Sequence, residues 1–92
     1  MNGYYFYYNN IDHFVKTNAQ RKTKSLCEKV ITAFGYRLND STVKWLQYTM
    51  QPATLEVKTC SHGDYYDIYG EGFGGYGHYV DGRDGQTKIV EL

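Results

Sequence analysis

The residues best able to do chemistry lie close together in the second half of the chain. His62 and Asp64 flank a glycine, and Asp67 and His78 follow within one predicted run of strands. A histidine beside a carboxylate supports general acid–base catalysis, because the carboxylate orients the imidazole and stabilises its protonated form. The surrounding sequence holds no Gly-x-Ser-x-Gly motif or other context for a serine nucleophile. We therefore expect no catalytic residue, and a small enzyme that uses His62, His78 and the nearby aspartates is kept as an alternative.

Metal-binding and nucleotide-binding motifs are incomplete in this sequence. Cys60 and His62 form a close pair, but a tetrahedral zinc site needs two further ligands at comparable spacing. The stretch from Gly70 to Gly75 matches the letters of the Gly-x-Gly-x-x-Gly fingerprint, yet no helix-forming segment follows to receive a pyrophosphate. Two Asp-Gly pairs further along are typical of turns rather than of a calcium loop. We therefore expect neither a metal ion nor a cofactor.

The strongest charged feature is a basic run in the first half of the chain. Five cations stand within fourteen positions, and Glu28 is the one acidic residue among them. These cations, which we expect to contact a partner, are Lys16, Arg21, Lys22, Lys24 and Lys29. Such a run forms either an ordinary solvated helix face or a surface for phosphates or for an acidic protein. Lysine contacts to phosphates position a partner and carry no sequence information by themselves.

Tyrosine is the other unusual feature, with eleven residues in a chain of 92. Alternate side chains of a strand point to opposite faces, so the aromatic run from Tyr4 to Tyr8 exposes one set of rings unless both faces are covered. Tyrosine is favoured in recognition surfaces because it combines a large rigid area with a hydrogen-bonding tip. The tyrosines that we expect to contact a partner are Tyr5, Tyr7, Tyr66 and Tyr76. The alternative is that the tyrosines fill a core that is poor in leucine and isoleucine.

The net charge argues against two classes of function. Ten basic and ten acidic side chains give a net charge of zero. A strongly basic nucleic-acid binder has a large positive net charge, and an acidic mimic of DNA has a large negative one. The charges are nevertheless unevenly spread, since residues 1–60 carry eight basic and four acidic side chains and residues 61–92 carry two and six. The two halves either attract each other in the fold or present two faces to different partners.

Length and composition indicate one folded domain, residues 1–92. Hydrophobic residues make up 41% of the chain and aromatic residues 17%, which is enough to build a single modest core. No apolar run reaches the roughly 20 residues that a membrane-spanning helix needs, and no signal-peptide pattern opens the sequence. We expect a cytoplasmic protein with no membrane partner, in which Cys27 and Cys60 are free thiols.

The first part of the chain predicts one strand and one long helix. Five aromatic residues in succession favour a strand at residues 4–8, which the following Asn-Asn pair ends as a turn or a helix cap. The main helix is predicted at about residues 18–34, where apolar residues recur at helical spacing, and Gly35 ends it. The apolar spacing also suggests an earlier helical turn beginning near Ile11.

The remainder predicts a series of strands. Residues 42–50 have a β-rich composition that favours a strand, and the alternative is a helix capped by Asp40. The Gln51-Pro52 pair is expected to break the chain. Further strands are predicted at residues 54–59, 65–69, 78–80 and 87–92. The expected fold is α+β, an antiparallel meander with one main helix packed on one face of the sheet.

The chain as a whole has the profile of a small phage-encoded protein. It is about ninety residues long and rich in tyrosine and asparagine, it lacks a catalytic constellation, and it combines a basic run with acidic segments. In this size and character it resembles the anti-CRISPR inhibitors. The resemblance implies binding to a Cas protein or to a Cas–guide RNA complex of an infected bacterial host, with target DNA blocked as the result.

The main functional hypothesis is therefore a non-enzymatic inhibitor that docks on a host defence protein or its ribonucleoprotein complex. The basic run would contact either RNA or DNA phosphates or an acidic protein surface, and the tyrosines would contact protein. One alternative is a stand-alone nucleic-acid-binding module whose tyrosines stack on bases, and the other is the small enzyme described above. The zero net charge favours the inhibitor, because a free nucleic-acid-binding domain usually carries net positive charge.

Overall fold

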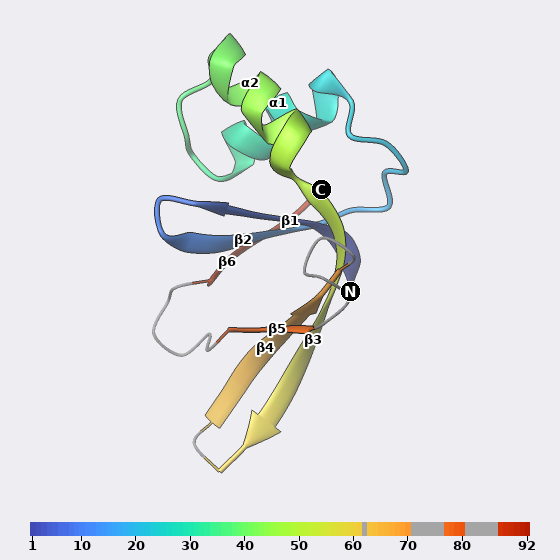
Figure 1. Cartoon of the computed structure of the whole chain (residues 1–92), viewed down its shortest axis with the longest axis vertical. Helices are drawn as coiled ribbons and strands as arrows, with labels where there is room; N and C mark the ends of the chain where they lie inside the picture. The colour runs from blue at the N-terminus through green and yellow to red at the C-terminus, as the bar shows by residue number, and fades with distance from the viewer. Residues whose placement is uncertain (62, 71–76, 81–86) are drawn as a thin grey trace.

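The chain forms two hairpins with a pair of helices between them, and it ends with two short strands (Figure 1). The computed structural model describes residues 1–61, 63–70, 77–80 and 87–92. Within these ranges the elements are β1 (Asn2–Tyr8), β2 (Ile11–Lys16), α1 (Lys24–Ala33), α2 (Asp40–Thr49), β3 (Gln51–Cys60), β4 (Gly63–Tyr69), β5 (Gly77–Val80) and β6 (Thr87–Glu91). The α+β class is confirmed, and the described chain has two helices where one main helix was predicted.

The described strands form one mixed sheet in the order β5-β4-β3-β1-β2-β6. Neighbouring strands pair antiparallel except β2 and β6, which are parallel, with His13 opposite Lys88 and Val15 opposite Val90. The predicted purely antiparallel meander is therefore wrong. The last strand returns to the opposite edge of the sheet instead of pairing with β5, and this places Lys88 beside residues from the first hairpin.

The first hairpin turns at Asn9 and Asn10, which both have left-handed backbone angles, with φ of 53° and 59°. A two-residue turn of this kind suits the twist of a hairpin, and asparagine tolerates it better than most residues. The turn folds residues 11–16 back as β2, so the helical turn predicted there is wrong. Phe14 is buried on one face of β2 and Val15 on the other, which is why the segment lacks the alternating pattern of a one-sided strand.

Helix α1 begins later than predicted. Its N-cap is Thr23, whose side-chain oxygen accepts a hydrogen bond from the Leu26 N–H at 3.1 Å. Residues 18–23 lie outside the helix although their composition is compatible with one. The Tyr4 hydroxyl donates to the Ala19 carbonyl at 2.9 Å and holds this segment against the sheet instead.

The end of α1 is confirmed at the predicted glycine. Gly35 has a φ of +82°, a conformation that other residues adopt only at a cost. The N–H groups of Gly35 and Tyr36 donate back to the carbonyls of Thr32 and Ile31, each at 3.0 Å. These bonds satisfy carbonyls that the last turn of a helix leaves without an intrahelical partner.

The region after α1 is a second helix, so the predicted strand there is wrong and the helical alternative is right. Its cap is Asn39, whose side-chain oxygen accepts from the Thr42 N–H at 2.8 Å, while Asp40 occupies the first turn. Val43 and Leu46 are buried at helical spacing. Burial of this stripe outweighs the preference of the neighbouring aromatic residues for strands.

The Gln51-Pro52 pair begins β3, and the predicted break is wrong because the chain passes from α2 directly into the strand. Pro52 lies opposite Tyr4 near the start of β3, a position where the missing N–H is tolerated. The predicted strands at residues 54–59, 65–69 and 78–80 are confirmed within β3, β4 and β5. The strand predicted at residues 87–92 is confirmed as β6, which ends at Glu91.

Hydrophobic side chains are buried on both faces of the sheet. The two helices cover one face over the first hairpin (Figure 1), and the core there includes Tyr4, Phe6, Val15, Val30 and Leu46. The second face holds a smaller cluster made of Tyr5, Phe14, Ala53, Leu55 and Ile68. The β3–β4 hairpin extends away from the helices (Figure 1). The helix-side face of the sheet therefore changes from covered to open near the start of β3.

Candidate functional site

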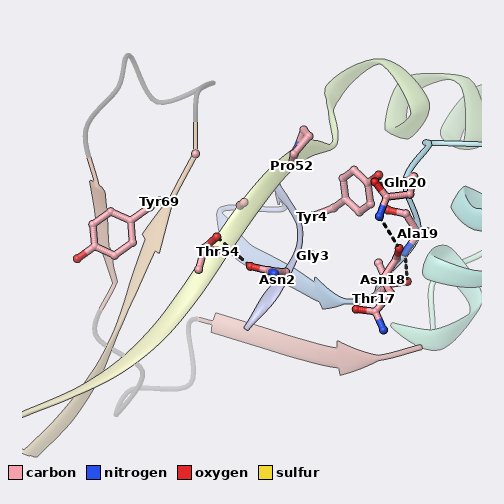
Figure 2. A pocket seen from close by; sticks show the side chains of 12 residues that line it. Asn2, Gly3, Tyr4, Thr17, Asn18, Ala19, Gln20, Pro52, Thr54 and Tyr69 are labelled. Atoms are coloured by element: carbon pink, nitrogen blue, oxygen red, sulfur yellow. Dashed lines mark hydrogen bonds between the residues drawn. The ribbon is translucent and has the colours of Figure 1, made fainter.

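A cleft of about 530 Å³ lies where the helix-covered part of the sheet meets the open β3–β4 hairpin (Figure 2). Its walls come from the start of β1, the loop at residues 17–20, the start of β3 and the end of β4. Its volume lies within the range of about 300–1,000 Å³ that is typical of small-molecule sites. Figure 2 shows Tyr69 on one side of the cleft, Asn18 and Gln20 on the other, and Asn2 with Thr54 between them.

The loop at residues 17–20 is fixed to the sheet at both of its ends. The Thr17 N–H donates to the Asn2 carbonyl at 3.3 Å. The Tyr4 hydroxyl donates to the Ala19 carbonyl, and burial raises the pKa of Tyr4, so this hydroxyl keeps its proton. The Ala19 N–H donates to Thr17 Oγ1 at 3.2 Å. The loop wall of the cleft is therefore positioned by hydrogen bonds from the sheet.

Among the described residues, each side chain that lines the cleft is either apolar or polar without a formal charge. Asn2 Oδ1 accepts from Thr54 Oγ1 at 3.3 Å, which leaves the Asn2 NH₂ group without a described partner. Gln20 Nε2 donates to the Asn18 carbonyl at 3.3 Å and keeps a second N–H and its side-chain oxygen for other partners. The described lining thus presents hydrogen-bond donors and acceptors without a formal charge.

Tyr69 forms the outer margin of the cleft and is 38% exposed. Its hydroxyl donates to Asp67 Oδ2 at 2.8 Å, and this hydrogen bond is the main reason that the pKa of Tyr69 is raised. The carboxylate therefore anchors the far end of the side chain, and Figure 2 shows the ring turned away from Asn18 and Gln20. Sequence reasoning did not single out this tyrosine, because its position beside the cleft depends on the pairing of β3 with β4.

The structure places the five predicted cations on three segments, the linker before α1, α1 itself and the end of β2. Arg21 and Lys22 directly follow the cleft wall, and the Lys22 carbonyl accepts from Gln47 Nε2 at 2.9 Å, which ties this linker to α2. Lys24 and Lys29 are exposed on α1, and five residues of helix place them about 140° apart around the axis. Lys16 ends β2, where its Nζ lies 3.7 Å from a carboxylate oxygen of Glu91.

The predicted partner-contacting tyrosines occupy different environments. Tyr5 is only 8% exposed and its hydroxyl donates to Asp12, so it does not offer its ring to a partner. Burial, and then this hydrogen bond, raise the pKa of Tyr5. Tyr7 is exposed, Tyr66 is half-buried against the second cluster, and Tyr76 lies outside the described residues.

Two exposed aromatic side chains on α2 were not predicted as contacts. Tyr48 is 91% exposed and Trp45 is 38% exposed, while the Trp45 ring leans on Tyr8 at a centroid distance of 5.4 Å. A helical interpretation of this region, with Val43 and Leu46 inward, places both of these aromatic residues outward. The outward position of Trp45 and Tyr48 could therefore have been predicted from the sequence, but only if residues 42–50 had been interpreted as a helix.

A buried histidine that sequence reasoning missed lies under the helices. His13 is fully buried, stacked on Phe6 at a ring distance of 4.6 Å. Its Nδ1 lies 2.9 Å from the Ile11 carbonyl and its Nε2 lies 2.6 Å from the Tyr36 hydroxyl. The carbonyl only accepts, so Nδ1 carries the proton and the Tyr36 hydroxyl donates to Nε2. Lys88 Nζ donates to the same hydroxyl at 3.3 Å, and burial lowers the pKa of His13.

The residues of the enzyme alternative are only partly placed by the structure. His62 lies outside the described residues, and the backbone of His78 on β5 lies opposite Ile68 on β4. Asp64 accepts from Thr59 Oγ1 at 2.9 Å. Across the described ranges, no group of three or more histidine, cysteine, aspartate or glutamate side chains is arranged to hold a metal ion. Most of the glycine fingerprint also falls outside the described residues.

Cys27 is buried within the helix-side core and has a free thiol. Burial raises the pKa of this thiol, so it is a poor nucleophile at neutral pH. The described helices include none that is long and apolar enough to cross a membrane. In the comparisons with known proteins, no family model, no curated protein and no solved structure matches this chain.

Proposed function

We propose that the protein is a non-enzymatic binding protein that docks on an anionic surface of a protein or nucleoprotein partner. The observation that carries the proposal is a group of four cations, close together in the chain, without ion pairs among the described residues. Arg21, Lys22, Lys24 and Lys29 follow one another from the linker into α1, and none of them pairs with a carboxylate among the described residues. An unpaired cation on the surface keeps its full capacity for a phosphate or a carboxylate of a partner.

Two cations outside the linker and α1 have acidic neighbours. Lys16 pairs with Glu91 and Lys58 pairs with Glu56, whereas Arg37 and Lys44, like the linker and α1 cations, have no ion pair among the described residues. The bond between Lys16 and Glu91 joins the basic and acidic halves of the sequence across β2 and β6. Attraction between the two halves of the sequence therefore gives Lys16 a partner within the chain, and the cations of the linker and α1 stay available for another molecule.

We propose further that the partner is a host defence complex of the CRISPR–Cas type and that docking blocks its nucleic-acid target. Support comes from the size and composition of the chain, from its zero net charge, and from cations that suit phosphates of a guide RNA. An inhibitor that docks on a protein does not need the net positive charge of a free nucleic-acid binder.

The docking surface is tested by charge reversal with a matched control. The variant Lys22→Glu with Lys24→Glu should weaken partner binding and lower the slope of log affinity against log salt by about 0.7–0.9 for each lost phosphate contact. Arg37→Glu with Lys44→Glu changes the net charge equally at two other exposed cations and should leave affinity nearly unchanged. Equal losses in both double variants would show that only the overall charge matters, and the proposed surface would be wrong.

The mode of action is tested by stoichiometry. Purified CRISPR effector complexes are titrated with the protein, and binding of labelled target DNA is measured. An inhibitor that acts by binding should give full inhibition near one equivalent. A catalyst with a typical turnover of about 10 per second would act well below that ratio. Complete inhibition at a hundredth of an equivalent that disappears in His62→Ala or His78→Ala would instead support the enzyme alternative.

A further inference from the structure

Strand β6 forms one edge of the sheet, and its outer side pairs with no other described strand. The Leu92 N–H donates to the Lys16 carbonyl at 2.9 Å, so the even-numbered residues from 88 to 92 turn their backbone groups toward β2. Backbone N–H and C=O directions alternate along a strand, so those of Thr87, Ile89 and Glu91 point outward. These three residues therefore offer a row of hydrogen-bond donors and acceptors to a further strand.

The charged side chains that could protect this edge are bound to residues of the same chain. Proteins commonly protect an edge strand with lysine or other charged side chains that discourage a second strand. In β6, Lys88 Nζ donates to the Tyr36 hydroxyl at 3.3 Å and lies 5.2 Å from the centre of the Tyr36 ring. A carboxylate oxygen of Glu91 lies 3.7 Å from Lys16 Nζ on the neighbouring strand β2. Both charged groups thus have partners within the chain, and β6 contains no proline or glycine that would interrupt pairing.

The residue at the middle of the edge is apolar and partly open to solvent. Ile89 lies beside the fully buried Phe14 on the face opposite the helices, and it is 36% exposed. β-Branched side chains pack well against a cross-strand neighbour of the same kind. An added strand with an apolar residue opposite Ile89 would therefore remove this side chain from water.

We propose that a second copy of this chain occupies the edge, with the two β6 strands antiparallel about a two-fold axis beside Ile89. In this register Ile89 lies opposite its own copy and Thr87 lies opposite Glu91, so three residue pairs exchange two hydrogen bonds each. Lys88 lies opposite Val90, and no like charges face each other. Moving the axis to Lys88 or Val90 leaves only two hydrogen-bonded pairs within β6, and at Lys88 it also places two lysines opposite each other. The edge is therefore best matched to itself in the register centred on Ile89.

This interface goes beyond the proposed function, because β6 carries none of the four cations of the linker and α1. Pairing of two short strands makes a contact below the roughly 1,200 Å² of a standard interface, so we expect a weak dimer. A dimer would carry two copies of the cationic docking surface. It would therefore bind more tightly to a partner that offers two anionic sites within reach of each other.

The test measures the mass of the full chain by sedimentation equilibrium from about 10 μM to about 1 mM, where a weak dimer forms. The wild type should approach the mass of a dimer as its concentration rises. Ile89→Pro should stay monomeric, because it replaces an outward N–H that the second strand needs and keeps the bonds of β6 to β2.

A charged variant with a matched control covers the case in which proline disturbs the strand. Ile89→Lys should weaken association about 2- to 30-fold, because it removes the central isoleucine pair and places two lysines opposite each other. Val57→Lys makes the same change at an exposed β-branched residue of β3 and should associate like the wild type. Thermal unfolding checks that each variant is folded.

Amide hydrogen exchange locates the contact within the chain. The outward N–H groups of Ile89 and Glu91 should exchange more slowly as the protein concentration rises. Those of Lys88 and Val90 already bond to β2, so their exchange should change much less. Association through another surface would not produce this alternation along β6.

Three results would overturn the proposal. One is a wild type that stays monomeric up to about 1 mM, and another is a dimer in which the exchange of Ile89 and Glu91 is unchanged. The third is protection of these two amides only after a purified CRISPR effector complex is added, which would make a strand of that complex the occupant. None of these results bears on the docking surface, which is tested separately by partner binding of the Lys22→Glu, Lys24→Glu variant.

Discussion

The buried histidine makes the stability of this protein sensitive to acid, and its surroundings determine the sign. His13 is fully buried, Nδ1 donates to a carbonyl, and Nε2 accepts from Tyr36. Burial lowers the pKa of His13 and is the largest cause; the hydrogen bond to Ile11 raises the pKa, Lys88 lowers it, and Asp12 raises it. A proton added to Nε2 would end the hydrogen bond that the Tyr36 hydroxyl donates to it and would place a second positive charge near Lys88.

The magnitude follows from linkage between protonation and folding. The unfolded chain binds a proton at His13 near the ordinary pKa of about 6.5, whereas the folded chain binds it only at lower pH. The contribution of neutral His13 is therefore fully present above pH 6.5. It falls by up to about 1.4 kcal/mol per pH unit as pH drops from 6.5 toward the folded-state pKa. Below that pKa the loss is complete and constant.

The assay compares urea unfolding of the wild type and of His13→Phe at several pH values between 7.5 and 4.5, followed by circular dichroism. Phenylalanine keeps a ring against Phe6 and cannot titrate, and His62 and His78 are common to both proteins, so their titration cancels in the difference. The wild type should lose stability relative to His13→Phe below pH 6.5. Parallel curves across this range would refute the assignment of His13 as a buried neutral group.

Two further changes test the local structure by the free energy of unfolding in urea. Gly3→Ala should destabilise the fold by about 1–3 kcal/mol or more, because a Cβ there would lie 1.8 Å from the Val15 carbonyl oxygen. Gly35→Ala should cost about 1–2 kcal/mol, because the space around its Cβ is open but its φ is +82°. A smaller loss of stability for Gly3→Ala than for Gly35→Ala would contradict the close approach of the strands at Gly3. Thr23→Ala removes the cap that bonds to the Leu26 N–H and should cost about 1 kcal/mol, with Thr23→Ser as the control that keeps the hydroxyl and most of the stability.

Local signals in the sequence were sufficient wherever one residue imposes a backbone conformation. The aromatic run predicted β1, and the end of α1 was predicted at Gly35, whose left-handed angle suits the only residue without a Cβ. The asparagine pair after β1 was also recognised as a turn or a cap. These features depend on neighbours in the chain, so the composition of a short segment is enough to predict them.

The sequence could not decide the elements whose burial comes from distant segments. Residues 11–16 became β2 because the first hairpin lies between two clusters, one under the helices and one with Leu55 and Ile68, and a strand buried on both sides has no alternating pattern. The helix at Asp40–Thr49 was similarly decided by the packing of Val43 and Leu46 in the helix-side core.

The candidate site shows the same division. The type and order of its cations were visible in the sequence, because the number and spacing of charged residues are local properties. The cleft itself depends on β1 pairing with β3, on β3 pairing with β4, and on the hydroxyl of Tyr4 holding Ala19. These contacts join residues far apart in the chain, and a segment's own pattern does not indicate which distant segment it will meet. The sequence therefore determined the chemical groups available, and the tertiary structure decided which of them lie around one cleft.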